Sequence, residues 1–315
     1  MSRQLLIRGG AIGDFVLTLP IMESLRGCEP DVEIHILGYP HIAELAVGRR
    51  HAGAVRRVDG PEWAPLFSRD SSLAAAELEY LRGFDRVICV WPDSDGTMRE
   101  NLRVAGVKQL LAINPMPPSG GAVHAVEFVA GQCERAGLSM KWIEPHLYPS
   151  ERDRGWCERY LRVTGAGASP LLGVAPGSGS AAKNWPVEGY AALIRHWIKR
   201  KGNVLLFAGP ADEQPVAELS ALLNNVEMFV IRDEPLARVA ALLERCEAFV
   251  GNDSGLAHIA AAVRTPTVVI FGPTDPAVWR PLASKVKALA PSAGGSIADV
   301  SSAAVIAEME SLIQG

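Results

Sequence analysis

Short apolar runs rich in β-branched residues alternate with longer amphipathic stretches along the whole chain. The short runs have the length of buried strands, and the longer stretches repeat their apolar positions with helical spacing. This alternation predicts βα units built on parallel sheets. The predicted strands cover residues 4–8, 32–37, 55–58, 86–90, 109–113, 171–175, 204–208, 228–231, 248–251 and 267–271.

Helices are expected between these strands. Pro20 fits the first turn of a helix that starts near Thr18, because proline lacks the backbone N–H that only later turns require. The other predicted helices cover residues 71–81, 97–104, 123–136, 152–163, 187–201, 212–223, 235–244, 256–263 and 300–313.

The chain has 315 residues, which is long for one core and natural for two domains. The strand–helix rhythm occurs in both halves, and the small residues of 164–170 have the composition of a linker. We therefore expect an α/β protein with an N-terminal lobe over 1–164, a C-terminal lobe over 170–295 and a last helix within 296–315.

Composition excludes several classes of protein. Apolar residues make up 48% and charged residues 21%, as in soluble globular proteins. A net charge of -4 disfavours nucleic-acid binding, which needs a basic excess. The five cysteines are scattered and form no Cys-x-x-Cys pair, which argues against disulfides and zinc and suits a reducing compartment. Without a signal-peptide pattern or a run of about 18 apolar residues, a cytoplasmic location is expected. Peripheral contact with the inner face of the membrane stays open.

Three loops carry most of the candidate chemistry: 8–14, 176–186 and 251–258. Each follows a predicted strand and leads into a predicted helix. In α/β proteins the carboxyl ends of strands and the positive ends of helices meet at such loops, and ligands bind there. Three such loops shared between two halves predict an enzyme that binds a phosphorylated ligand.

In the first loop, Gly10 and Gly13 allow a tight turn, and Asp14 stands at a helix start. One interpretation makes Asp14 a helix cap, a position that favours aspartate. The other makes its carboxylate a general base that removes a proton from an acceptor hydroxyl. The pattern leaves both open.

In the second loop, Gly177 and Ser178 are small enough to free backbone N–H groups for an anion, and Lys183 adds a mobile positive charge. These features predict a diphosphate cradle, although the spacing is not that of a P-loop. The alternative is a flexible loop with a solvated lysine.

In the third loop, Ser254 and Gly255 precede a helix whose amino end would favour a departing diphosphate. Asp253 cannot attract a phosphate, so we expect it to orient the loop or to bind a sugar hydroxyl. His258 shares a helical face with Ser254. It is either a structural histidine or a second group of the same site.

Taken together, the motifs resemble those of the bacterial heptosyltransferase family. The resemblance covers residues 8 to 281 and depends on the combination, since no single motif is specific. The motifs are Gly13-Asp14 followed by Leu17-Thr18-Leu19-Pro20, Lys183-x-Trp185-Pro186, Asn252-Asp253-Ser254-Gly255-x-x-His258 and Phe271-Gly272-Pro273-Thr274-Asp275-Pro276.

The resemblance implies a GT-B fold, in which two Rossmann-like lobes face a central cleft. The acceptor would bind the N-terminal lobe and the activated sugar the C-terminal lobe, with inverting transfer that needs no metal. Asp14 matches the family's proposed base, and Lys183 matches its donor-phosphate lysine. Asp253, Ser254, Gly255 and His258 match the donor-binding loop. In such folds the last helix commonly packs back toward the N-terminal lobe.

The resulting hypothesis is a cytoplasmic glycosyltransferase that moves heptose from an ADP-linked donor onto a lipopolysaccharide core or a related surface glycan. The nucleotide sugar is a co-substrate, and no further cofactor is expected. The acceptor is a glycan or glycolipid. The alternatives are a nucleotide-sugar epimerase or hydrolase, and a non-catalytic nucleotide-sugar-binding protein.

Overall fold

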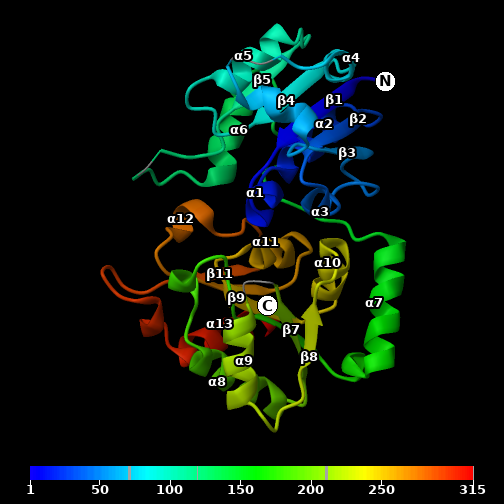
Figure 1. Ribbon diagram of the computed structural model, residues 1–315. Coiled ribbons are helices and arrows are strands. Elements are labelled where there is room, and N and C mark those ends of the chain that lie inside the picture. Colours follow the sequence, from blue (N-terminus) through cyan, green and yellow to red (C-terminus); the bar gives the residue numbers. More distant parts are fainter. Residues whose placement is uncertain (70–71, 119, 210–211, 315) are drawn as a thin grey trace. The chain divides into compact units, whose positions relative to one another are not determined.

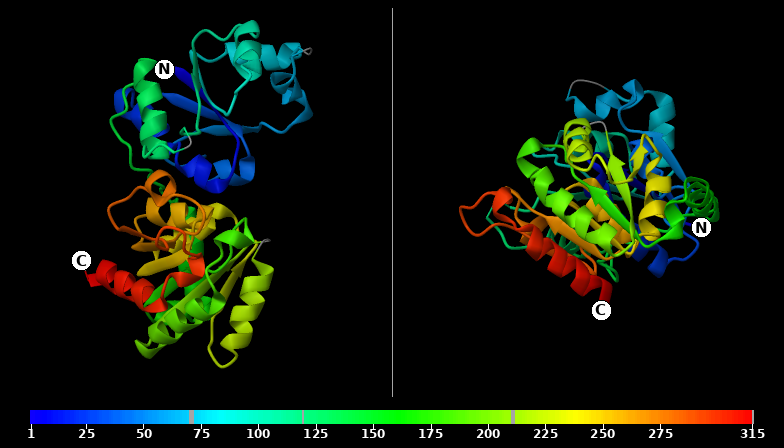
Figure 2. Two further views of the ribbon diagram at one scale, coloured as in Figure 1. Left: turned by 90° about the vertical axis from the view of Figure 1, so that its left-hand side faces the viewer. Right: turned by 90° about the horizontal axis from the view of Figure 1, so that it is seen from below.

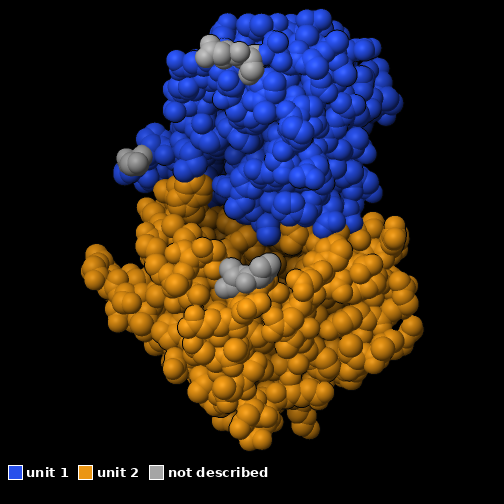
Figure 3. Space-filling view, viewed as in Figure 1, with its two compact units in different colours: residues 1–148 blue, residues 149–315 orange. Residues whose placement is uncertain are grey.

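The computed structural model describes residues 1–69, 72–118, 120–209 and 212–314. The chain divides into two compact units, Met1–Tyr148 and Pro149–Gly315 (Figures 1 and 3). Each unit contains one parallel sheet flanked by helices. Two Rossmann-like units are what the strand–helix rhythm predicts.

Unit 1 contains a five-stranded sheet in the order β3-β2-β1-β4-β5. Leu5, Leu6 and Ile7 of its central strand are fully buried, as expected for a strand covered on both faces. The strands are β1 (Arg3–Arg8), β2 (Glu33–Gly38), β3 (Ala54–Arg57), β4 (Arg86–Val90) and β5 (Leu110–Ile113). The helices are α1 (Ile12–Val16), α2 (Leu19–Cys28), α3 (Pro40–Ala43), η1 (Pro61–Phe67), α4 (Ala75–Arg82), α5 (Thr97–Val104) and α6 (Ala125–Arg135).

Unit 2 contains a six-stranded sheet in the order β11-β10-β9-β6-β7-β8. The strands are β6 (Leu171–Ala175), β7 (Asn203–Ala208), β8 (Phe229–Arg232), β9 (Ala248–Asn252), β10 (Thr267–Ile270) and β11 (Val286–Leu289). The helices are α7 (Glu151–Thr164), η2 (Ala166–Ala168), η3 (Ala181–Lys183), α8 (Val187–Lys199), α9 (Glu213–Leu222), α10 (Leu236–Glu244), α11 (Gly255–Ala262), α12 (Pro276–Trp279), η4 (Ile297–Asp299) and α13 (Ser302–Gln314).

The ten predicted strands all occur, with each end within one residue of its predicted place. The helix predicted near Thr18 is α2, which carries Pro20 in its first turn. The elements that were not predicted are the edge strand β11, the short helices α1, α3 and α12, and the 3-10 helices η1, η2, η3 and η4. Of the helix predicted over 71–81, the first residue, Ser71, lies outside the described residues.

The boundary between the units differs from the prediction, because α7 belongs to unit 2 rather than to an N-terminal lobe ending at 164. Arg154 of α7 binds Glu244 of α10 through two hydrogen bonds of 2.7 and 2.8 Å. Cys157 of α7 is buried and donates to the Ala241 carbonyl. These contacts join α7 to α10, so residues 164–170 connect α7 to β6 inside unit 2 and are not the linker.

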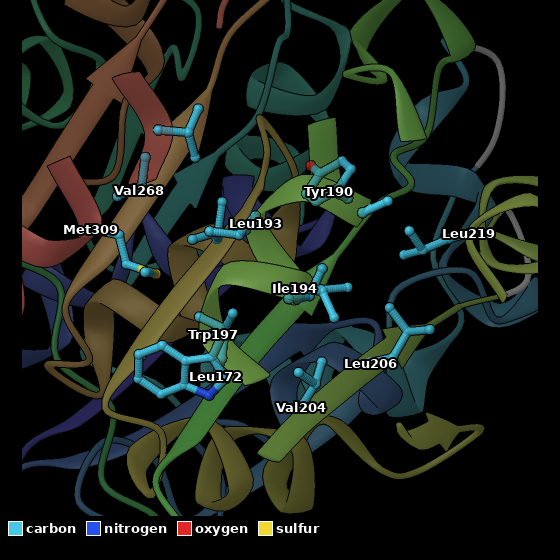
Figure 4. Packing of buried hydrophobic residues seen from close by; sticks show 14 of the residues in the cluster. Leu172, Tyr190, Leu193, Ile194, Trp197, Val204, Leu206, Leu219, Val268 and Met309 are labelled. Carbon is cyan, nitrogen blue, oxygen red and sulfur yellow. The ribbon is translucent and has the colours of Figure 1, made fainter. Parts of the chain in front are cut away.

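The core of unit 2 forms around α8, where Tyr190, Leu193, Ile194 and Trp197 are at most 1% exposed (Figure 4). Their spacing places all four on one helical face. Burial of each large apolar side chain contributes about 1.5–3 kcal/mol, so this face fixes α8 on the sheet.

The C-terminal helix α13 completes this core, and its expected packing toward the N-terminal lobe stays a prediction. Its buried residues Val305, Met309 and Leu312 belong to the same apolar cluster as α8. Nε2 of His196 in α8 lies 2.9 Å from Oε1 of Glu310 in α13. Figure 2 shows α13 alongside unit 2. The apolar side chains of α13 are therefore buried within unit 2.

Candidate functional site

The loops that follow β6, β9 and β10 lie side by side in unit 2, because these strands are neighbours in the sheet. β6 and β9 are adjacent in the sheet. From β6 the chain continues to β7 on one side of this pair, and from β9 it continues to β10 on the other side. Such a switch in direction leaves a crevice at the carboxyl ends of the strands, where α/β proteins bind ligands. The second and third predicted loops meet at this point.

Lys183 and Asp253 form an ion pair across these loops. The Lys183 ammonium lies 2.6 Å from Oδ2 of Asp253. The Thr274 hydroxyl donates to the same oxygen, also at 2.6 Å. The Asp253 side chain is 8% exposed and that of Lys183 28%, so the lysine keeps an open side. The Asp253 carboxylate therefore ties the loop that carries Lys183 to Thr274, a residue of the motif over 271–276.

Asn252, the last residue of β9, is fully buried and fastens the second loop to the sheet. Its Oδ1 accepts hydrogen bonds from the Trp185 backbone N–H at 3.0 Å and from the Tyr190 hydroxyl at 2.9 Å. Its Nδ2 donates to the carbonyls of Pro176 at 2.8 Å and Gly177 at 3.3 Å. One side chain therefore holds both ends of the loop that carries Lys183.

Ser178 stabilises the middle of the same loop. Its hydroxyl lies 2.7 Å from the Ser180 carbonyl and 2.8 Å from Oδ1 of Asn184. The Ser180 N–H donates back to the Ser178 hydroxyl at 3.3 Å. The loop is therefore internally bonded rather than a flexible tether for Lys183.

Position 177 must be glycine because the Asp212 side chain lies directly against it. A Cβ at position 177 would lie 1.7 Å from Oδ1 of Asp212. Oδ2 of the same carboxyl accepts the Gly209 N–H at 2.7 Å. Burial raises the pKa of Asp212, although the bond from Gly209 opposes that shift. Nothing in the sequence distinguishes this aspartate from an ordinary residue at a helix start.

The third loop ends at the amino end of α11, with Ser254 as the cap residue. The Ser254 hydroxyl is buried and has no hydrogen-bond partner in the described part of the chain. Gly255 is the first residue of α11 and brings its backbone N–H groups to the same edge. His258 is only 6% exposed, so its predicted contact with a ligand stays a prediction.

A second candidate site lies in unit 1, where β1 and β4 are neighbours and the sheet again changes direction. Oδ2 of Asp14 accepts the Ala11 backbone N–H at 3.0 Å, and Oδ1 lies 3.4 Å from the Arg8 guanidinium. Arg8 is 5% exposed and donates to the Val90 carbonyl. Burial lowers the pKa of Arg8, and the charge of Asp14 opposes that shift. Asp14 therefore satisfies the helix start and still exposes a third of its side chain.

Glycine at position 10 makes this arrangement possible. Gly10 has a φ of 97°, and a Cβ there would meet Oδ2 of Asp14 at 2.9 Å. Gly13 lies inside α1, directly before Asp14. The first loop thus places the Asp14 carboxylate in the first turn of α1.

The family model of glycosyltransferase family 9 (heptosyltransferase) matches residues 129–301, more than half of the chain. The chain belongs to glycosyltransferase family 9. The matched span includes Lys183, Asp253 and Ser254 but not Asp14. For Asp14, the support comes from the geometry of unit 1 alone.

Several solved structures have the same fold. A family 9 glycosyltransferase from Veillonella parvula has a TM-score of 0.80 at 20% identity, covering 99% of this chain and 97% of that one. The E. coli ADP-heptose lps heptosyltransferase II has a TM-score of 0.74 at 20% identity, covering 100% and 99%. E. coli heptosyltransferase WaaC with ADP has a TM-score of 0.70 at 18% identity, covering 98% and 99%. A search of curated protein sequences finds no match. The likeness confirms the predicted fold class, two Rossmann-like lobes of the GT-B type.

Unit 1 of this family 9 glycosyltransferase also contains a pocket of about 430 Å³. The pocket lies at the carboxyl ends of β4 and β5, beside the loop that follows β4. No sequence motif marked it, because its walls come from separate segments of the chain. It is lined by Cys89, Trp91, Pro92, Asp93, Ser94, Arg99, Ala112, Ile113, Asn114, Met116 and Gln132.

The described ranges contain no group of three or more His, Cys, Asp or Glu side chains that could hold a metal ion. They also contain no helix that is long and apolar enough to cross a membrane.

Proposed function

We propose that this family 9 glycosyltransferase moves heptose from ADP-heptose onto a lipopolysaccharide core or a related surface glycan. The ion pair between Lys183 and Asp253, at the switch point of the unit 2 sheet, is the observation that carries the proposal. A cation held beside a helix amino end suits the diphosphate of a nucleotide sugar. The E. coli relatives solved with ADP and with ADP-2-deoxy-2-fluoro heptose support ADP as the nucleotide.

On the donor side, Lys183 and the start of α11 stabilise the departing diphosphate. As the bond between the sugar's anomeric carbon and the diphosphate breaks, its electron pair leaves with the diphosphate oxygen. The Lys183 ammonium, the Ser254 hydroxyl and the N–H groups at Gly255 donate to the negative charge that develops there. In this proposal, these donors make a metal ion unnecessary.

On the acceptor side, Asp14 acts as the general base. The acceptor hydroxyl attacks the anomeric carbon from the face opposite the leaving group, so the configuration inverts, and its proton passes to the Asp14 carboxylate. Arg8 and the Ala11 N–H hold that carboxylate in position. The buried Arg8 is itself fixed by the Val90 carbonyl, so the base is supported from the sheet.

The experiment that tests the proposal is a transfer assay with ADP-heptose and a heptose-deficient lipopolysaccharide, followed by mass spectrometry of the glycolipid and by ADP release. Acceptor-dependent ADP release with a heptose-sized mass gain, unchanged by EDTA, is the expected result. ADP release without acceptor would indicate a hydrolase instead. Donor binding without any turnover would indicate a non-catalytic nucleotide-sugar-binding protein.

A further inference from the structure

We propose that Thr274 is a positioning residue of the donor site, which holds the Asp253 carboxylate and, through it, the Lys183 ammonium. This inference rests on the proposed function, because Lys183 is the residue assigned there to the donor diphosphate. It goes further by giving a role to the motif over 271–276, to which the proposed reaction assigns no step.

The Thr274 hydroxyl and the Lys183 ammonium bind the same oxygen of Asp253. Each lies 2.6 Å from Oδ2. A carboxylate can only accept hydrogen bonds, so the hydroxyl is the donor in this contact. The distance is that of a charge-assisted hydrogen bond. Thr274 therefore helps to fix the orientation of the carboxylate with which Lys183 is paired.

Asp253 depends on these two donors because little water can replace them. Its side chain is 8% exposed. Away from bulk water, a hydrogen bond to a charged group is stronger, and a charge that loses a partner costs more free energy. The Asp253 backbone is already fixed, since its N–H donates to the Ile270 carbonyl at 3.0 Å. The direction of the side chain is what the two donors determine.

The motif over 271–276 also touches the Lys183 loop at a second point. Gly272 lies so close to this loop that a Cβ there would be 3.0 Å from the Ala182 carbonyl oxygen. Ala182 directly precedes Lys183. The motif therefore supports the lysine twice, by backbone packing at Gly272 and through the side chain of Thr274.

The short helix α12 fixes the end of the motif. Asp275 caps this helix by accepting the Ala277 backbone N–H at 2.8 Å, and Pro276 is its first residue. Thr274 stands directly before the cap. Its backbone is thus placed by the turn that follows it, and its hydroxyl is used for Asp253.

Loss of the Thr274 hydroxyl should release Lys183 from its fixed place. With one donor gone, the Asp253 carboxylate can rotate, and the ammonium loses the partner that orients it toward the diphosphate of the proposed donor. The lysine keeps its charge, so the loss should be smaller than on removal of Lys183. A positioning role therefore predicts an effect that exists only while Lys183 is present.

The test is a double-mutant cycle on ADP binding, measured by isothermal titration of the full chain. Its members are the wild type, Thr274→Val, Lys183→Ala and the variant with both changes. Thr274→Ser is added because it keeps the hydroxyl. The matched control is Thr267→Val, at the amino end of β10, since Thr267 is fully buried and donates to the Thr265 carbonyl at 2.7 Å.

We expect Thr274→Val to bind ADP about 5-fold more weakly, a usual coupling between neighbours in one hydrogen-bond network. Thr274→Ser and Thr267→Val should bind like the wild type. In the Lys183→Ala background, Thr274→Val should cause no further loss. Wild-type affinity in Thr274→Val, or no rescue by serine, would overturn the proposal. An equal loss in the Lys183→Ala background would also overturn it, because Thr274 would then not act through the lysine.

A second measurement needs no nucleotide. Brief labelling of amines with acetic anhydride, followed by peptide mass spectrometry, reports how firmly Lys183 is held. Lys183 should be labelled faster in Thr274→Val than in the wild type, whereas the exposed Lys199 should be labelled at the same rate in both. Unchanged labelling of Lys183 would contradict the positioning role.

Failure of this inference is distinguishable from failure of the proposed function. If ADP binds through Lys183 but Thr274→Val changes neither its affinity nor the labelling, the positioning role is wrong and the donor assignment stands. If Thr274→Val speeds the labelling of Lys183 but the wild type does not bind ADP, the positioning role stands and the donor assignment is wrong.

Discussion

The Lys183 ammonium lies 2.6 Å from Oδ2 of Asp253, a residue 70 positions further along the chain. The pair joins the loop after β6 to the loop after β9 before any ligand is bound. In the proposed function, a diphosphate would meet a cation that is already positioned, so little side-chain freedom would be lost on binding. Asp253 would in turn limit the charge that Lys183 presents, which favours release of the product.

Replacing Lys183 with alanine should weaken ADP binding by about 10- to 100-fold, the value of a hydrogen bond to a charged group. Asp253 would then be left without its cation and would repel the diphosphate. Isothermal titration of ADP checks this. Lys199→Ala, an exposed lysine in the last turn of α8, is the matched control and should bind as the wild type does. Unchanged affinity in Lys183→Ala would remove the lysine from the donor site.

Replacing Asp14 with asparagine should lower kcat by about 10²- to 10⁴-fold, the usual contribution of a general base. ADP affinity should not change, because the asparagine oxygen can still accept the Ala11 N–H and the donor loops lie in unit 2. Transfer rates and ADP titration together check this. Asp31→Asn, at an exposed position, serves as the control. An Asp14→Asn variant with full activity would disprove the base assignment.

Replacing Asn252 with aspartate should lower the free energy of unfolding by about 2–4 kcal/mol, because it removes two donors inside a buried network. The carbonyls of Pro176 and Gly177 would then face a carboxylate oxygen. We also expect weaker ADP binding at temperatures where the variant is folded, since the Lys183 loop loses its anchor. Chemical denaturation and ADP titration measure the two effects. Asn225→Asp, in an exposed turn, should change neither.

Stability in acid should depend on Glu23 of α2. Burial alone would raise the pKa of Glu23, but the adjoining His51, Arg50 and Tyr148 side chains bring it below its ordinary value. A lowered pKa stabilises the folded state above the unfolded pKa of about 4.3, and this contribution is lost as the pH falls through the folded value. The wild type should therefore exceed Glu23→Gln in stability at neutral pH, with the gap closing below about pH 4. A gap that does not change with pH would contradict this.

The sequence predicts those features that depend on local pattern. The strands follow from short apolar runs, and the place of the three loops at the carboxyl ends of strands follows from the alternation of strands and helices. Long-range packing was not predictable in the same way. The destination of α13 depends on which apolar face in the folded chain still needs cover, and the α7–α10 contact depends on Arg154 and Glu244, which are 90 positions apart.

The side-chain contacts of the site that were not predicted share a physical reason. Thr274 and Asn252 act through single side-chain hydrogen bonds, to Asp253 and to the loop that carries Lys183. Asp212 matters only because Gly177 leaves room for it. No spacing of residues in the sequence indicates such contacts. They become visible only when the ends of the strands are placed together.

The most direct test of the account is a titration of ADP-heptose into the wild-type protein, beside ADP, UDP, GDP and their common sugar conjugates. We predict that ADP-heptose and ADP bind more tightly than the uridine and guanosine compounds. Preference for another nucleotide, or no binding of any of them, would contradict the proposed donor.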